Sequence, residues 1–269
     1  SAAGNPEPTP FIFPYNLDEP FKKIKLKNRL QEISGLTMAG KNKIACVQDE
    51  DGLIFIIDID KEEIVEQIKF AKDADYEGVE FVGNKAYVVK MSWDIYEVKK
   101  FGKKSQDTQK HETHLSSEND VEGLGYDAVG NRLLLACKAK PGEKKKDYKG
   151  QKAIYAFDLK TEELSEKPVF LIGLDEVQEF VGTDAVAKAY EKFVEFFEPS
   201  KGNITFQPSG VAVQPNTQNI YVISAVGNLL VVMSPNGKIL HIEKLSGKKF
   251  KQPEGITFEV LCLKPEKLD

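Results

Sequence analysis

Three glutamates recur in the same short phrase of this 269-residue chain, and together they could bind a cation. Glu77, Glu122 and Glu254 each precede a glycine, then an aliphatic residue and, two positions further on, an apolar one. Ser34 and Ser209 take the place of the glutamate in two further copies. Carboxylates that lie close together repel unless a cation or hydrogen-bond donors offset their charge. A hard cation such as Ca²⁺ accepts several oxygen ligands in a flexible geometry, so these five residues are candidate metal ligands.

The spacing of the five copies predicts the fold that must position them. The steps from Gly35 through Gly78, Gly123 and Gly210 to Gly255 are 43, 45, 87 and 45 residues. A recurrence near 44 residues is the period of a four-stranded propeller blade. The innermost strands of a propeller line its central channel, and the residues at their starts gather at one mouth. We therefore expect the three glutamates and two serines to meet at one mouth of a channel.

Each unit also carries short β-rich runs that are separated by turn residues. The expected strands are 43–47, 53–58 and 64–68; 85–89, 94–98 and about 112–115; 132–137, 153–158 and 168–172; and 219–223, 228–233 and 239–242. The double-length third step contains a lysine-rich loop and a segment, 175–197, whose apolar residues recur at helical spacing. We expect one inserted α-helix there, which packs on the rim of the propeller or caps its channel.

The last blade has to be assembled from both ends of the chain. Residues 11–17 and 21–26 are expected to form its outer strands and 255–258 its innermost strand, a closure that removes exposed sheet edges. The prediction is an all-β fold: one β-propeller domain at 11–269, with five four-stranded blades closed by N- and C-terminal strands, behind a flexible leader at 1–10. Six blades are the alternative if 173–207 contains sheet. After Phe258 the chain runs on to Pro265 without a turn, so either the closing blade is incomplete or the terminus is atypical.

Composition excludes several classes of protein. The net charge is −5, from 37 basic and 42 acidic residues, whereas a nucleic-acid binder usually carries a clear basic excess. No apolar run approaches the roughly 20 residues that are needed to cross a membrane. Cys46, Cys137 and Cys262 are odd in number and widely spaced, so they predict no disulfide framework. Cys46 and Cys137 lie in apolar runs, and we expect both to be small buried hydrophobes.

The order and spacing of the motifs resemble the SdiA-regulated family of bacterial β-propellers. The residues that carry the resemblance are Ile33-Ser34-Gly35-Leu36, Val47-Gln48-Asp49-Glu50, Tyr76-Glu77-Gly78-Val79-Glu80 and Gln252-Pro253-Glu254-Gly255-Ile256-Thr257-Phe258. The resemblance implies an exported or membrane-anchored protein without a settled biochemical activity. The leader fits a tether left after removal of a signal peptide or lipoprotein anchor, or else an expression scar. We therefore expect a periplasmic or cell-envelope location, with lipid anchoring upstream of residue 1 as an option.

Other residues that could do chemistry have plainer interpretations. Asp49, Glu50 and Glu80 are acidic neighbours of the motifs, and we expect them to be solvated. His111 and His114 lie three residues apart in a polar stretch, which favours an exposed loop over a metal site. Trp93 lies in an expected hairpin and favours packing over ligand stacking. The sequence has no Gly-x-Ser-x-Gly elbow, phosphate-binding loop or His-Glu-x-x-His pair.

These observations favour an exported binding or scaffold module, with Ca²⁺ at the channel mouth as a possible cofactor. The Glu-Gly phrase is similar to that of calcium-dependent propeller lactonases, so the alternative is a Ca²⁺-dependent hydrolase of lactonase or phosphoesterase type. A purely structural role is also open, in which each Glu accepts hydrogen bonds from backbone N–H groups of the neighbouring blade. Without a catalytic constellation the sequence leans against an enzyme but leaves the question open. The expected partner is a small molecule, a polysaccharide or a protein, but no nucleic acid, and the expected state is a monomer.

Overall fold

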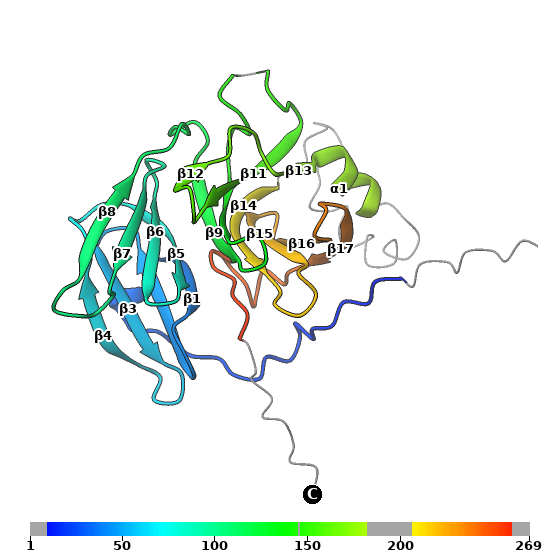
Figure 1. Cartoon of the computed structure of the whole chain (residues 1–269). Helices are drawn as coiled ribbons and strands as arrows, with labels where there is room; N and C mark the ends of the chain where they lie inside the picture. Colours follow the sequence, from blue (N-terminus) through cyan, green and yellow to red (C-terminus); the bar gives the residue numbers. More distant parts are fainter. Residues whose placement is uncertain (1–9, 145, 182–205, 260–269) are drawn as a thin grey trace, which may run out of the picture.

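The computed structural model describes residues 10–144, 146–181 and 206–259, whose strands form four antiparallel sheets around a central channel (Figure 1). The first two sheets contain β1 (Ile33–Met38), β2 (Lys43–Gln48), β3 (Leu53–Asp58) and β4 (Glu63–Lys69), then β5 (Tyr76–Val82), β6 (Lys85–Lys90), β7 (Ile95–Lys99) and β8 (Asp107–His111). The third contains β9 (Val121–Asp127), β10 (Arg132–Cys137), β11 (Gln151–Asp158), β12 (Glu163–Leu164) and β13 (Phe170–Gly173). The fourth contains β14 (Gln207–Val213), β15 (Ile220–Val226), β16 (Leu229–Met233) and β17 (Ile239–Lys244).

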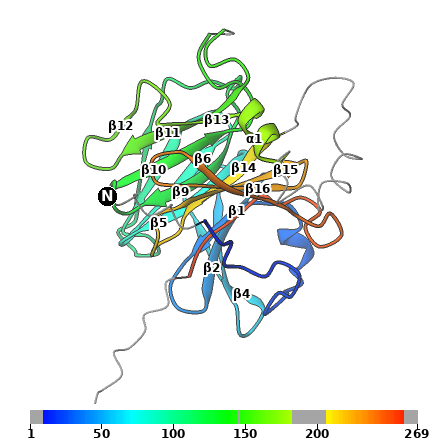
Figure 2. The ribbon, with the colours of Figure 1, turned by 90° about the vertical axis from the view of Figure 1, so that its right-hand side faces the viewer.

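The sheets are blades of a β-propeller. The first strand of each sheet is innermost, because β1 lies against β5, β5 against β9 and β9 against β14, although these strands share no ladder. Figure 2 shows the blades stacked around this inner set. The all-β propeller of four-stranded blades is therefore confirmed. The described part of the chain contains no helix long and apolar enough to span a membrane.

The core lies between consecutive blades rather than inside any one of them. Leu134 and Leu135 of β10 follow one another and so point to opposite faces of the third sheet. Leu134 packs in the cluster shared with the fourth sheet, and Leu135 in the cluster shared with the second. Both side chains are fully buried. Because each middle strand is buried on both faces, these strands read as continuous apolar runs and were easy to recognise in the sequence.

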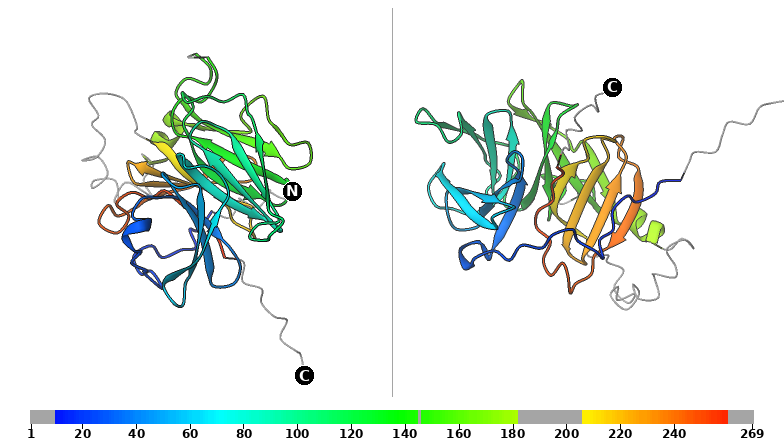
Figure 3. Two further views of the ribbon diagram at one scale, coloured as in Figure 1. Left: turned by 90° about the vertical axis from the view of Figure 1, so that its left-hand side faces the viewer. Right: turned by 90° about the horizontal axis from the view of Figure 1, so that it is seen from below.

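The prediction of five blades, or six, is wrong for the described residues, which contain four. The segments 11–17 and 21–26 form no strand, and neither does 255–258. We call residues 10–27 the strap and residues 252–259 the closing segment. Figure 3 shows the strap crossing from the fourth sheet to the first, where a fifth blade was expected. Pro14 and Pro20 interrupt the strap and Pro253 the closing segment, and proline cannot donate to a ladder.

Two smaller predictions need correction, and a third is confirmed as far as the structure describes it. The outer strand of the second blade is β8 at Asp107–His111, not 112–115. The third blade carries two short outer strands, β12 and β13, which both pair with β11. The inserted helix begins close to where it was predicted, as α1 (Leu174–Val181), and packs near β13 and β17. The rest of the expected helix, the leader at 1–9, Cys262 and the chain beyond 259 lie outside the described residues.

Candidate functional site

The residue before each motif glycine shares one backbone feature in all four blades: it is the extra residue of a β-bulge. The ladder between the first two strands of each sheet passes over Ser34, Glu77, Glu122 and Ser209 in turn. A bulge bends the strand and re-aims a side chain, and its extra residue takes no part in the ladder. We call these four the bulge residues. The motif therefore encodes a β-bulge at the start of each inner strand, and this bulge turns a polar side chain out of the ladder.

The glycine that follows each bulge residue lets the inner strands approach one another. A Cβ on Gly35 would lie 2.7 Å from the Cα of Gly78, and one on Gly78 would lie 2.6 Å from the Cβ of Leu124. Gly255 of the closing segment also permits a close approach, since a Cβ added there would lie 2.7 Å from the Cγ of Leu36. Gly35, Gly78, Gly210 and Gly255 line a small cavity of only about 10 Å³, and we call this constricted level of the channel the waist. All five copies therefore surround the channel, although the fifth is not a strand.

The waist separates two cavities. The cavity at the starts of the inner strands, here called the acidic mouth, has a volume of about 500 Å³. The cavity on the other side, here called the second cavity, has a volume of about 250 Å³ and is lined by the ends of the same strands. Ser34, Glu77 and Glu122 at the starts of three inner strands line the first cavity, and later residues of all four inner strands line the second, so the inner strands run in one direction along the channel. The two sets of side chains are three to four residues apart, or about 10–13 Å.

The three predicted glutamates do meet at the acidic mouth. Six carboxylates from well-separated parts of the chain line this cavity. They belong to Glu32, Asp49, Asp75, Glu77, Glu122 and Glu254. Burial, then the neighbouring Asp75 and Glu122 carboxylates, raise the pKa of Glu77 well above its usual value. Burial, then Glu122, likewise raise the pKa of Glu254. The mouth therefore holds more negative charge than the fold itself neutralises.

One ammonium group, that of Lys138, lies close enough to these carboxylates to neutralise part of their charge. The Nζ of Lys138 donates to the Glu122 carboxylate and lies 3.8 Å from Asp120. Burial raises the pKa of Glu122, and this bond with Lys138 offsets part of the rise. In the described part of the chain, no backbone N–H donates to Glu77 or Glu122. The purely structural role predicted for these glutamates therefore lacks the hydrogen bonds that it requires.

The two serines differ from each other. The hydroxyl of Ser209 donates to the carbonyl oxygen of Pro253 at 2.6 Å and accepts from the N–H of Ala225 at 3.0 Å. Ser209 is thus committed to fastening the closing segment to β14 and lies outside the acidic mouth. Ser34 lines the mouth with the glutamates. Only Ser34 stays a candidate supporting ligand.

The sequence analysis missed several residues of the mouth, although a signal for them existed. Alternate residues of a strand share a face, and the residue two positions before each bulge residue is acidic in three blades. These residues are Glu32 and Asp75, which line the mouth, and Asp120, which lies close to Lys138 instead. Asp49 was noticed but was expected to be solvated, whereas its Oδ1 is buried without a hydrogen-bond partner. Such an atom is a ready cation ligand.

Groups of three ligand atoms within 4.8 Å of one another occur twice in the described residues. One is Glu32, Asp49 and Glu50, at the rim of the acidic mouth. The other, Glu97, His111 and Glu162, lies among the outer strands. Glu77, Glu122 and Glu254 line one cavity but do not form such a group, so a metal ion would have to draw them together.

Two predictions about single residues were wrong. His111 is not in an exposed loop: it ends β8, and its Nε2 lies 2.9 Å from the Glu97 carboxylate, which also accepts from Lys85 at 2.6 Å. Burial alone would raise the pKa of Glu97, yet these two bonds hold it below its usual value. Glu80 is not a solvated neighbour of the mouth but lines the second cavity, because it lies three residues beyond the bulge. Cys46 and Cys137 are buried and free, as expected.

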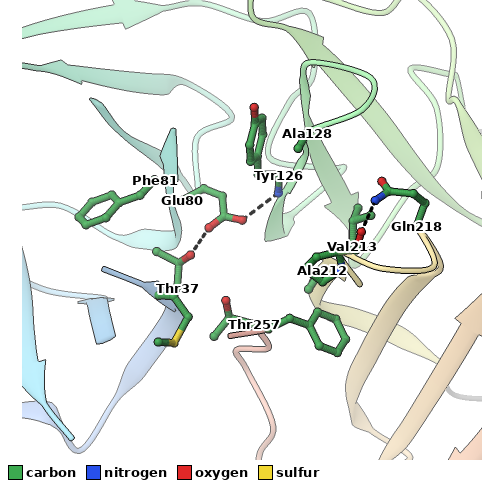
Figure 4. Close-up of a pocket in the computed structure, with 12 residues that line it drawn as sticks. Thr37, Glu80, Phe81, Tyr126, Ala128, Ala212, Val213, Gln218 and Thr257 are labelled. Carbon is green, nitrogen blue, oxygen red and sulfur yellow. Dashed lines mark hydrogen bonds between the residues drawn. The ribbon is translucent and has the colours of Figure 1, made fainter. Parts of the chain in front are cut away.

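Figure 4 shows the second cavity, where Glu80 lies between Thr37 and Tyr126. The hydroxyl of Thr37 donates to one carboxylate oxygen of Glu80, and the N–H of Tyr126 donates to the other at 2.8 Å. Glu80 of the second blade thus joins the first and third. Burial raises its pKa to about 7, against the lowering effect of these hydrogen bonds.

Known proteins resemble this chain in solved structure, at low sequence identity. No family model and no curated protein sequence matches this chain. Similar solved structures include a streptogramin B lyase (TM-score 0.45, 9% identity, 81% of this chain and 56% of that one) and the RRP9 WD40 repeats (TM-score 0.45, 12% identity, 84% and 56%). Another is a nidogen/laminin complex (TM-score 0.49, 13% identity, 84% and 68%). This chain thus spans little more than half the length of the lyase and RRP9 structures. The resemblance to the SdiA-regulated family stays a prediction.

Proposed function

We propose that this chain is a binding propeller whose acidic mouth holds a divalent cation, with Ca²⁺ as the first candidate. The observation that carries the proposal is the convergence of Glu77, Glu122 and Glu254 on one cavity, from two inner strands and the closing segment. Their raised pKa values have a common cause, which is burial beside other carboxylates. A cation bound between them would remove that repulsion.

Calcium fits this set of donors better than smaller cations do. Ca²⁺ takes six to eight oxygen ligands in an adaptable geometry, whereas Mg²⁺ demands a near-ideal octahedron. Asp75 and the unpartnered Oδ1 of Asp49 could add to the three glutamates, and Ser34 lies on the same wall. Because the ligands come from the second blade, the third blade and the closing segment, the ion would also hold the ring together. The role of the bound ion would then be to complete the surface at the mouth to which a partner binds.

A thermal-shift titration with CaCl₂ after treatment with EDTA tests the proposal, supported by calorimetry for the affinity. A ligand that binds only the folded state stabilises it by about 2.7 kcal/mol at one hundred times its Kd. For a domain of this size that corresponds to a rise in Tm of roughly 5 °C or more. Glu122→Gln should abolish the rise. No rise at millimolar Ca²⁺ in the unsubstituted protein would end the proposal.

Two controls locate the ion. Glu66→Gln, an exposed glutamate on β4, makes the same chemical change away from the channel and should leave the rise intact. Glu50→Gln distinguishes the mouth from its rim, since Glu50 belongs to the rim group but does not line the mouth. Loss of the rise in Glu50→Gln, with a normal rise in Glu122→Gln, would assign the ion to the rim and overturn the ligands proposed here.

Hydrolysis is the alternative to this proposal and export is a separate addition to it, and each has its own test. The roughly 500 Å³ mouth has room for a substrate beside an ion, so the Ca²⁺-loaded protein should be assayed on lactones and phosphoesters. Turnover that is absent from Glu122→Gln would identify the hydrolase alternative. An exported protein would meet Ca²⁺ outside the cytoplasm, where binding modules typically have a Kd of about 0.1–1 mM. Fractionation of the cells that naturally produce the protein would test the location.

A further inference from the structure

The second cavity is chemically unlike the acidic mouth. Its lining is mostly apolar, with Phe81, Val213 and Phe258 among the side chains, and Glu80 is the only formally charged residue in that lining. Its volume of about 250 Å³ exceeds the roughly 150 Å³ that admits a benzene ring to an engineered apolar cavity. A single carboxylate in such a lining is too few ligands for Ca²⁺, which needs six or more oxygens.

The only ionisable carboxylate in the lining of this cavity, that of Glu80, is an acceptor, and it lies among the hydroxyl-bearing residues Thr37, Tyr126 and Thr257. Both oxygens of Glu80 receive hydrogen bonds from the protein, yet each carboxylate oxygen has two lone pairs and can accept again. Gln218, in the turn before β15, donates through Nε2 to the carbonyl oxygen of Pro215 at 2.6 Å. Its Oε1 is buried and has no hydrogen-bond partner. An unsatisfied buried acceptor is costly, and a turn of the Gln218 side chain, which lines the cavity, would present this atom to a donor held there.

The two acceptors come from separate parts of the propeller. Glu80 belongs to β5 of the second blade, and Gln218 follows β14 of the fourth. The third blade lies between them in the ring, so they approach the channel from different sides, as Figure 4 shows. A ligand that satisfies both acceptors must carry donors at two places on an apolar body.

We propose that the second cavity binds a small aromatic primary amine with a second donor group, its ammonium on Glu80 and its second donor on Gln218. This site is independent of the cation proposed for the acidic mouth, from which the waist separates it. The raised pKa of Glu80, about 7, agrees with this geometry, because an ammonium would favour the ionised carboxylate that burial disfavours. The ring of the ligand would lie against the apolar wall.

The test is calorimetry at pH 8 with tyramine, which has an ammonium and a phenol, and with tyrosol, in which a hydroxyl replaces the ammonium. A hydrogen bond to a charged group is strong enough that tyramine should bind about tenfold or more tightly than tyrosol. In Glu80→Gln that preference should fall to about one. Equal affinity of the two compounds for the unsubstituted protein, or an unchanged preference in Glu80→Gln, would overturn the proposal.

A second variant covers the case in which Glu80→Gln fails to fold. Ala128 lies in the exposed turn after β9 and still lines the cavity, as Figure 4 shows. Ala128→Trp should therefore fold and partly fill the cavity, which would weaken tyramine binding about tenfold or more. Val129→Trp is the matched control, since Val129 is 77% exposed in the same turn and does not line the cavity. If both variants weaken tyramine binding equally, or if neither weakens it, then tyramine binds outside the second cavity and the proposal fails.

Discussion

At the scale of the residue, this propeller uses one backbone device for two purposes. The bulge turns the residue before each motif glycine out of the ladder and toward the channel mouth. Where that residue is Ser209, the side chain fastens the closing segment. Where it is Glu77 or Glu122, the side chain becomes part of a crowded acidic cavity. Ser209 thus stabilises the fold, whereas Glu77 and Glu122 place carboxyl groups where burial disfavours their ionised form.

The charge of Glu77 should make stability depend on pH. The pKa of Glu77 is raised in the folded state. The free energy that this shift contributes to folding is therefore fully present below about pH 4.5 and is lost as the pH rises through the folded pKa. In EDTA, Glu77→Gln should therefore be more stable than the unsubstituted protein at pH 9, on the order of 1 kcal/mol or more, with little difference at pH 4.5. Urea unfolding across this range measures it. With saturating Ca²⁺ the sign should reverse at pH 7, and a pH-independent difference would contradict the argument.

At the scale of the element, the motif glycines set how closely the inner strands pack. Gly78 is the clearest case, because an added Cβ would lie 2.6 Å from the Cβ of Leu124 on the next inner strand. A real contact of this length does not occur, so one strand must shift. The waist would then widen, and the two cavities would no longer be separated.

Gly78→Ala should accordingly destabilise the protein by about 1–3 kcal/mol, the usual cost of overpacking a closely packed core. Gly247→Ala is the matched control, since nothing lies within 4 Å of the added Cβ at that position. Chemical denaturation of both variants gives the comparison. If the two variants prove equally stable, close approach is not the reason for the motif glycine.

The elements could be predicted from the sequence wherever periodicity was strong. The middle strands, such as β10 and β16, are buried on both faces and read as apolar runs, so their bounds were nearly correct. The outer strand β8 is Asp107–His111, a polar segment without such a run, and it was placed too late. The acidic mouth could be predicted because its glutamates repeat. Glu80 could not, since only the ring as a whole brings it to Thr37 and Tyr126.

At the scale of the whole molecule, the ring is closed without a complete fifth blade. The strap and the closing segment cover the face of the fourth sheet, where Phe13, Leu17 and Phe258 pack against a buried cluster that includes Tyr221 and Leu230. The ring of Phe13 stacks on His241 of β17, with centroids 4.9 Å apart and an interplanar angle of 14°. Aromatic packing therefore takes the place of ladder hydrogen bonds at this seam.

Phe13→Ala tests whether the strap closes the ring or merely lies on it. The loss of apolar burial and of an aromatic contact should lower the free energy of unfolding by about 1–3 kcal/mol. Ile12→Ala is the control, because Ile12 is 79% exposed beside it and its loss should change stability by no more than about 0.5 kcal/mol. Hydrogen exchange should also quicken at β17 in Phe13→Ala while the second blade stays protected. If the two variants are equally stable, packing of the strap adds nothing to the stability of the fold. The hydrogen bonds of Ser209 and the close packing at the waist would then be what keeps the ring closed.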